Sequence, residues 1–160
     1  DRGVAFYRER FSTVGLFENT PYPGIEGQLQ ALLDLGVTLR VATSKPHVFA
    51  EQILNHFGLA RYFDDVYGSE LSGERADKSD LLAYALKETG VDGAGSIMVG
   101  DRSHDMVGAA SNGIVGVGVL YGYGSREELM RAGARTIVVS VSELVSRLKG
   151  ALTPPSAPST

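Results

Sequence analysis

Residues 97–105 read Ile-Met-Val-Gly-Asp-Arg-Ser-His-Asp, and this stretch decides how the rest of the chain is interpreted. Its three apolar residues predict a buried strand, and the glycine at position 100 lets the backbone turn sharply and approach a ligand closely. Asp101 and Asp105 follow, four residues apart. Ligands of α/β proteins bind beyond the carboxyl ends of strands, and paired carboxylates are hard oxygen ligands that suit magnesium. We therefore expect both to bind a metal ion; the alternative is a turn aspartate and a helix N-terminal charge.

On both sides of this stretch, apolar strands alternate with helical patterns. Strands are expected at 37–42, 66–67, 97–99, 115–120 and 136–139. Helical spacing of apolar residues lies between them and stops at glycines, namely Gly36, Gly58, Gly90 and Gly113. Capping-box spacing marks two further helix starts, at Ser125–Glu128 and Ser140–Glu143. The alternation predicts an α/β fold with a mostly parallel sheet that helices cover on both faces.

The two ends of the chain differ from this core. Residues 1–18 carry apolar residues at helical spacing, and the turn-rich stretch Asn19–Gly24 separates them from the rest. Residues 151–160 are rich in proline and serine and are expected to be a disordered tail. We therefore predict one α/β domain over residues 19–150.

Composition narrows the class of protein. The 43% apolar and 21% charged residues are typical of a globular domain, and the net charge of −4 gives no electrostatic reason to expect nucleic acid or an anionic membrane as a partner. There is no cysteine, which excludes disulfides and thiolate ligands and fits a cytoplasmic location. No apolar run approaches the roughly 20 residues that span a bilayer.

Two more polar features accompany the predicted sheet. Thr43 and Ser44 follow the strand at 37–42, where a hydroxyl and backbone N–H groups at a helix start suit a phosphate oxygen. Capping of the next helix is the commoner role for such residues. Lys78 begins the helix after a polar loop, and the helix dipole disfavours a cation there unless a carboxylate or phosphate lies nearby. A solvated lysine is the alternative.

Together, the strand before Thr43, the helix-borne Lys78 and the Gly100–Asp105 motif occur in an order that resembles the haloacid dehalogenase superfamily. The sequence is similar to that of the phosphoglycolate-phosphatase and 5′-nucleotidase-like branch of this superfamily in three stretches, Thr43–Pro46, Gly100–Asp105 and Gly118–Gly124. The resemblance implies a Rossmann-like core and a magnesium-dependent phosphatase that acts on a small phosphorylated substrate.

The resemblance also implies roles for single residues. Thr43 would bind the transferring phosphoryl group, with Ser44 as a further contact, and Lys78 would neutralise its charge. Asp101 would ligate Mg²⁺, and Asp105 would support the metal or hold Lys78. Such positive groups suit phosphoryl transfer, where catalysis depends on positioning and electrostatic stabilisation.

The family's first motif, Asp-x-Asp after an apolar strand, has no counterpart in the sequence. In the family that strand is central in the sheet, and its first aspartate is the nucleophile, so an aspartyl-phosphate cannot form without it. We therefore expect a fragment of a longer phosphatase, in which residues 1–18 end a helical cap, and no turnover by these residues alone. The alternative is a non-catalytic member that binds a phosphorylated ligand or a protein.

Some alternatives remain open at this stage. The glycines Gly116, Gly118 and Gly122 lack the spacing of a nicotinamide-binding loop, so that interpretation is set aside. Phosphomutase or phosphonate-cleaving chemistry, the identity of the phosphate ester and the oligomeric state are not decided by these motifs.

Overall fold

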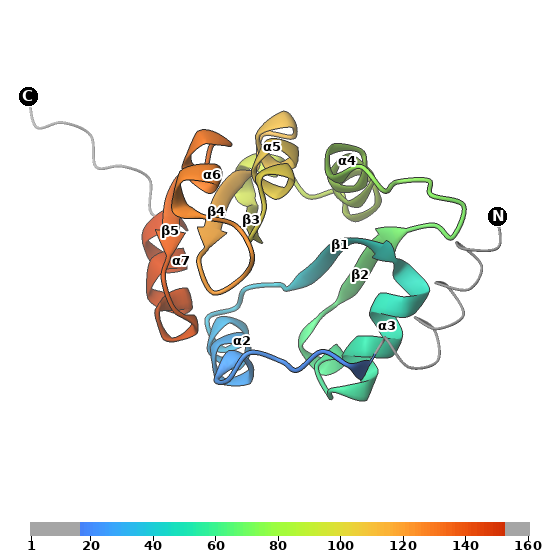
Figure 1. Ribbon diagram of the computed structural model, residues 1–160, viewed down its shortest axis with the longest axis horizontal. Helices are drawn as coiled ribbons and strands as arrows, with labels where there is room; N and C mark the ends of the chain where they lie inside the picture. The colour runs from blue at the N-terminus through green and yellow to red at the C-terminus, as the bar shows by residue number, and fades with distance from the viewer. Residues whose placement is uncertain (1–16, 153–160) are drawn as a thin grey trace, which may run out of the picture. The chain divides into compact units, whose positions relative to one another are not determined.

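The computed structural model describes residues 17–152, and the chain divides into two compact units, residues 1–77 and 78–160 (Figure 1). All but two residues of the predicted cap end at 1–18 and most of the predicted tail therefore lie outside the described residues. The division between Asp77 and Lys78 falls inside the predicted 19–150 domain. Each unit contains its own parallel sheet, which confirms the α/β class.

The first unit packs helices on a two-stranded sheet. Its described elements are, in chain order, α2 (Ile25–Asp34), β1 (Arg40–Pro46), α3 (His47–His56), η2 (Ala60–Tyr62) and β2 (Asp65–Ser69). Helix α2 buries Leu29 and Leu32 and is followed by Gly36, whose φ of 80° is the left-handed conformation expected of a glycine after a helix. Strands β1 and β2 pair in parallel, with a register shift between Ala42 and Pro46.

The prediction for the strand at 37–42 is wrong in its bounds. Strand β1 begins at Arg40 and continues to Pro46, so Thr43 and Ser44 lie within the strand and not after it. The strand extends this far because Pro46 still pairs with Ser69 of β2 beyond the irregular stretch. Pro46 is also the N-cap of α3, which has no side-chain cap, so the capping interpretation of Thr43 and Ser44 is wrong as well.

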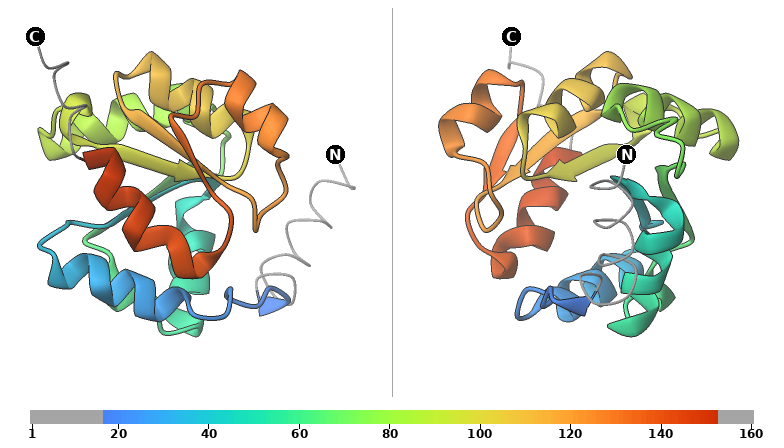
Figure 2. Two further views of the ribbon diagram at one scale, coloured as in Figure 1. Left: turned by 90° about the vertical axis from the view of Figure 1, so that its left-hand side faces the viewer. Right: turned by 45° about the vertical axis from the view of Figure 1, so that its right-hand side comes forward.

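The second unit is a three-stranded parallel sheet in the order β3-β4-β5. Its elements are α4 (Lys78–Thr89), η3 (Gly93–Gly95), β3 (Ile97–Gly100), α5 (Ser103–Ser111), β4 (Val115–Val119), α6 (Arg126–Arg131), β5 (Thr136–Val138), η4 (Val141–Glu143) and α7 (Leu144–Leu152). Figure 2 shows α5 and α6 on one face of this sheet and α7 on the other, as expected for strands with continuous apolar runs.

Burial in the second unit is greatest around the middle strand. Val117 of β4 is fully buried, whereas β3, at the edge of this sheet, is only half-buried along its whole length. Helices α5 and α6 contribute Met106 and Leu129 to one apolar cluster, which Ala134 and Ile137 complete. This cluster fixes α6 against the sheet, and α6 carries a residue of the site described below.

Among residues 17–152, no helix combines the length and the apolar character that a bilayer span requires.

We expect Leu129→Ala to lower the free energy of unfolding by about 2–5 kcal/mol, because Leu129 is 0% exposed and its loss leaves a cavity in this cluster. The neighbouring Met130 is 50% exposed, so Met130→Ala should change the free energy by no more than about 0.5 kcal/mol. Urea denaturation followed by circular dichroism measures both. Equal effects of the two substitutions would contradict the described packing of α6.

Candidate active site

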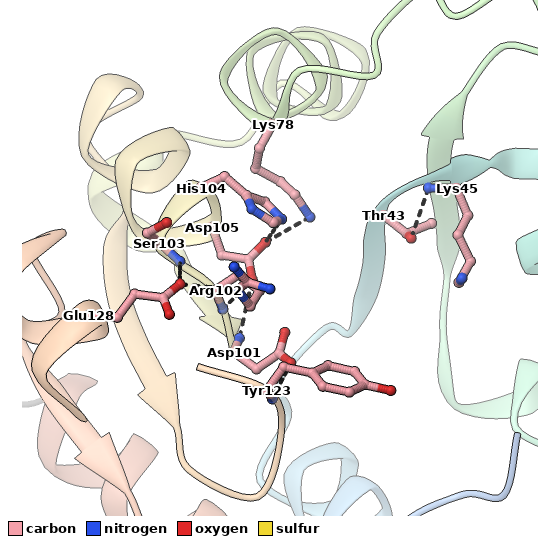
Figure 3. A network of polar contacts seen from close by, with 10 residues as sticks. All are labelled: Thr43, Lys45, Lys78, Asp101, Arg102, Ser103, His104, Asp105, Tyr123 and Glu128. Carbon is pink, nitrogen blue, oxygen red and sulfur yellow. Dashed lines mark hydrogen bonds and ion pairs between the residues drawn. The ribbon is translucent and has the colours of Figure 1, made fainter. Parts of the chain in front are cut away.

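The site in the second unit lies where β3 and β4 end. Because parallel strands end at the same edge of a sheet, the loop after β3, which begins at Asp101, meets the loop after β4. The backbone N–H of Tyr123 donates a hydrogen bond of 2.9 Å to Asp101 Oδ2 (Figure 3). The two loops therefore fix the direction of the Asp101 carboxylate.

Asp105 is buried in the first turn of α5, and both of its oxygens are occupied. Oδ1 lies 2.9 Å from Lys78 Nζ. Oδ2 accepts hydrogen bonds of 3.1 Å from the backbone N–H groups of Asp101 and Arg102. Figure 3 shows the ammonium and the two N–H groups reaching the carboxylate from two sides. A buried carboxylate requires such compensation, since an unpaired charge away from water is costly.

Lys78 is buried, and the prediction that a carboxylate lies near it is confirmed. The side chains of Lys78 and Asp105 are each 6% exposed, so the solvated-lysine interpretation is wrong. The negative charge offsets the unfavourable position of a cation at the start of α4. Gly108 of α5 makes room for the lysine, because a Cβ there would lie 2.7 Å from Lys78 Cγ.

The glycine at position 100 allows a close approach, but by the Asp105 side chain; the predicted approach of a ligand stays a prediction. A Cβ at Gly100 would collide with the side chain of Asp105. The absence of a side chain lets Asp105 reach back under the loop and accept its two N–H groups. Asp105 is also an acidic residue in the first turn of α5, as the helix N-terminal interpretation predicts, and its binding of a metal stays a prediction.

The donor set at the end of β3 fits a magnesium ion. Of the Asp101 carboxylate, Oδ2 accepts the Tyr123 N–H, and Oδ1 makes no hydrogen bond or ion pair within residues 17–152. No cluster of three or more His, Cys, Asp or Glu side chains suited to a metal occurs in that range. Magnesium commonly takes one or two carboxylates and completes its shell with water and substrate phosphate, so Asp101 alone or with Asp105 is a sufficient protein contribution.

Thr43 and Ser44 belong to the first unit, so their approach to Lys78 and Asp101 stays a prediction. Thr43 Oγ1 accepts a hydrogen bond of 3.2 Å from the Lys45 backbone N–H, which leaves the hydroxyl hydrogen able to donate to a phosphate oxygen. Ser44 is exposed, and its carbonyl accepts a hydrogen bond of 3.0 Å from Ser69 Oγ.

Glu128 is a residue of the site that the sequence did not reveal. Its capping-box spacing with Ser125 is half realised, because Ser125 Oγ accepts from the Glu128 N–H at 3.1 Å. The Glu128 carboxylate does not turn back to Ser125. Instead, Oε1 accepts hydrogen bonds from Arg102 Nε at 3.0 Å and from the Ser103 N–H at 2.9 Å.

The same contacts lower the pKa of the Glu128 carboxyl, with the Ser103 amide as the largest cause and the Arg102 guanidinium next. Because the folded-state pKa is lowered, the stabilising contribution of these contacts is present above the usual glutamate pKa. It is lost only as the pH falls through the lowered value. The carboxylate is therefore charged throughout the neutral range.

We expect Asp105→Asn to lower the free energy of unfolding by about 3–5 kcal/mol, since the substitution leaves the Lys78 ammonium buried without its counter-charge. Adding Lys78→Met should recover part of this loss. The control is Glu127→Gln, which removes one charge from an ion pair with Arg131 whose side chains are 71% and 80% exposed. It should cost less than about 1 kcal/mol. Urea denaturation compares the variants, and equal losses for Asp105→Asn and Glu127→Gln would contradict the buried pair.

Several known proteins are similar in sequence to this chain. A 5′-nucleotidase of Pseudomonas aeruginosa is 48% identical over 126 residues, which cover 79% of this chain and 57% of that protein. A protein of Mycobacterium tuberculosis named tyrosine-protein kinase PtkA is 38% identical over 152 residues, covering 95% and 52%. A phosphoglycolate phosphatase of Neisseria meningitidis is 33% identical over 149 residues, covering 91% and 62%. The chain thus spans about half the length of the curated relatives it matches.

A solved structure and a family model point to the same kind of protein as these relatives. The crystal structure of a predicted phosphatase from Clostridium acetobutylicum matches with a TM-score of 0.90 and 47% identity, over 92% of this chain and 68% of that one. A family model for haloacid dehalogenase-like hydrolases matches residues 3–119, which include Thr43, Lys78 and the Gly100–Asp105 loop. With its buried lysine held by the second aspartate of that loop, the chain belongs to the haloacid dehalogenase-like hydrolase family.

Proposed function

We propose that this chain is the larger part of a magnesium-dependent phosphomonoesterase that acts on a small phosphorylated metabolite. The observation that carries the proposal is the buried Lys78–Asp105 pair beside Asp101 at the end of β3. A fixed ammonium next to a carboxylate with one uncommitted oxygen is an arrangement that attracts a phosphate and a divalent cation together.

Each residue of the proposed site has a separate task. Lys78, held by Asp105, neutralises charge on the phosphoryl oxygens, and the Thr43 hydroxyl, with Ser44 as a further contact, donates to them. Asp101 holds Mg²⁺, with Asp105 as a second support. When bound, Mg²⁺ supplies positive charge that stabilises the phosphoryl group during transfer. Asp105 contributes to catalysis mainly through Lys78, because both of its oxygens already have partners.

The covalent step requires a nucleophile from outside these 160 residues, since no Asp-x-Asp occurs in them. In the proposed reaction a carboxylate oxygen attacks phosphorus and the bond between phosphorus and the ester oxygen breaks. The second aspartate of the family's Asp-x-Asp motif would give the leaving oxygen its proton. Water then hydrolyses the aspartyl-phosphate and regenerates the carboxylate. The Lys78–Asp105 pair and Asp101 would face the same phosphoryl group through both steps.

Two classes of substrate have support from relatives. The names of the Pseudomonas and Neisseria proteins point to a nucleoside 5′-monophosphate and to phosphoglycolate. Both are small phosphomonoesters and need the same groups around phosphorus. The absence of cysteine is compatible with the cytoplasm, which is the location that we propose for the reaction.

A second candidate is phosphoryl transfer to a protein tyrosine, which the 38% identity to PtkA favours. The site residues would handle a phosphoryl group in either reaction, so the acceptor is the difference. Incubation with ATP and tyrosine-containing peptides tests this candidate, since a kinase yields phosphotyrosine, whereas the proposed phosphomonoesterase leaves the peptides unmodified and releases phosphate from phosphate monoesters. A third candidate is a non-catalytic protein that binds a phosphorylated ligand or a partner, which the absence of Asp-x-Asp from these residues favours.

In the full-length protein, we expect release of phosphate from phosphoglycolate or nucleoside 5′-monophosphates to need Mg²⁺ and to stop with EDTA. Asp101→Asn should lower kcat/KM by about 10²–10³-fold, because it removes a charged group that holds the cation. The control is Asp34→Asn, a change of the same kind at the exposed end of α2, which should leave the rate unchanged. A colorimetric phosphate assay measures the rates of the unaltered protein, with and without EDTA, and of both variants.

Hydrolysis that persists in EDTA, or that persists with Asp101→Asn, would refute the magnesium-dependent mechanism. We expect no hydrolysis by the 160 residues alone, because they lack the nucleophile. Magnesium-dependent turnover by these residues alone would show that another group takes that role.

A further inference from the structure

Glu128 reaches from α6 to a loop that lies 25 and 26 residues earlier in the sequence. The helix begins at Arg126, and a capping-box glutamate would turn back to the backbone of Ser125. Glu128 instead directs Oε1 to Arg102 and Ser103. Its side chain is still 28% exposed, so burial of the side chain does not by itself explain this direction. The departure from the local pattern indicates a use in the tertiary structure.

Three consecutive backbone N–H groups, two from the loop after β3 and one from the first residue of α5, are held by two carboxylates. Those of Asp101 and Arg102 donate to Asp105, and that of Ser103 donates to Glu128. Asp105 belongs to α5, which continues directly from the loop, whereas Glu128 belongs to a helix beyond the next strand. Glu128 therefore ties the loop to a separate element of the second unit.

Four hydrogen bonds together restrict where Asp101 can point. Its N–H is bound by Asp105, its Oδ2 by the Tyr123 N–H, and the two residues after it by Glu128. Contacts to charged partners are stronger than those between neutral groups, and the lowered pKa of Glu128 keeps its carboxylate charged at neutral pH. Loss of the two hydrogen bonds to Glu128 would let Arg102 and Ser103 move and carry Asp101 with them.

We propose that Glu128 is a positioning residue, which fixes the loop that carries Asp101 and so sets the affinity of this site for a divalent cation. The inference rests on the proposed function, because it takes Asp101 as the ligand. Residues that orient metal ligands without touching the metal typically change metal affinity by about 10–100-fold when they are replaced. A purely structural role in attaching α6 would change stability and leave the cation affinity as it is.

The chain offers a matched control beside Glu128. Glu127 is the preceding residue of the same helix and carries the same charge, but it pairs with Arg131 of α6 and not with the loop. Glu127→Ala and Glu128→Ala therefore remove the same side chain from adjacent positions. Glu128→Gln adds a milder change, since its amide oxygen can still accept from Ser103 while the charge opposite Arg102 is lost.

Isothermal titration of the full-length protein with MgCl₂ tests the inference. We expect Glu128→Ala to weaken Mg²⁺ binding by about 10–100-fold. Glu128→Gln should lie between Glu128→Ala and the unaltered protein, and Glu127→Ala should stay within about twofold of it. In the phosphatase assay, Glu128→Ala should need more Mg²⁺ for half-maximal rate and recover most of kcat when Mg²⁺ saturates. Hydrogen exchange of the Ser103 amide should be faster in Glu128→Ala than in Glu127→Ala.

The outcomes separate this inference from the proposed function. If Asp101→Asn loses Mg²⁺ binding while both Glu128 variants bind Mg²⁺ like the unaltered protein, the positioning role is refuted and the proposed function stands. If Asp101→Asn binds Mg²⁺ normally, the proposed metal site fails and this inference fails with it. Glu128→Gln keeps the size of the side chain, so it decides the question even if Glu128→Ala unfolds.

Discussion

The second unit depends on the compensation of one buried charge, the carboxylate of Asp105. Its two oxygens take an ammonium and two backbone N–H groups, so no part of the charge is left without a partner. These contacts join the start of α4, the loop after β3 and the first turn of α5. Because a buried carboxylate must be paired and hydrogen-bonded to be tolerated, the three elements hold one another in a single arrangement.

This compensation also divides the work between the two aspartates of the Gly-Asp-x-x-x-Asp loop. Asp105 is committed to Lys78 and the backbone, whereas Asp101 keeps one oxygen without a contact in the described part of the chain. A cation held by Asp101 and an ammonium held by Asp105 would present two positive groups at the same edge of the sheet. Phosphoryl transfer needs such groups in fixed positions, since reorganising them during the reaction would be costly.

Several residues of the site are unfavourable or unexpected in their own helices, and contacts with residues distant in the sequence explain them. A lysine at the start of a helix is unfavourable in isolation, yet Lys78 is satisfied by Asp105. A glutamate with capping-box spacing leaves its own helix for Arg102 and Ser103. Gly108, in the middle of α5, weakens that helix locally but leaves space for Lys78. Functional sites are where such conflicts between local preference and fold are expected.

The sequence by itself determined the order of strands and helices, and it supplied the residues that we propose for a phosphate and metal site. Apolar runs, glycine stops and the Gly100–Asp105 motif are local signals, so they remain legible without a structure. The tertiary structure alone decided that β1 runs on to Pro46, that Asp105 binds Lys78, and that Glu128 and the Tyr123 amide hold the loop around Asp101. These outcomes depend on strand register and on contacts between residues far apart in the chain, which no pattern of neighbouring residues specifies.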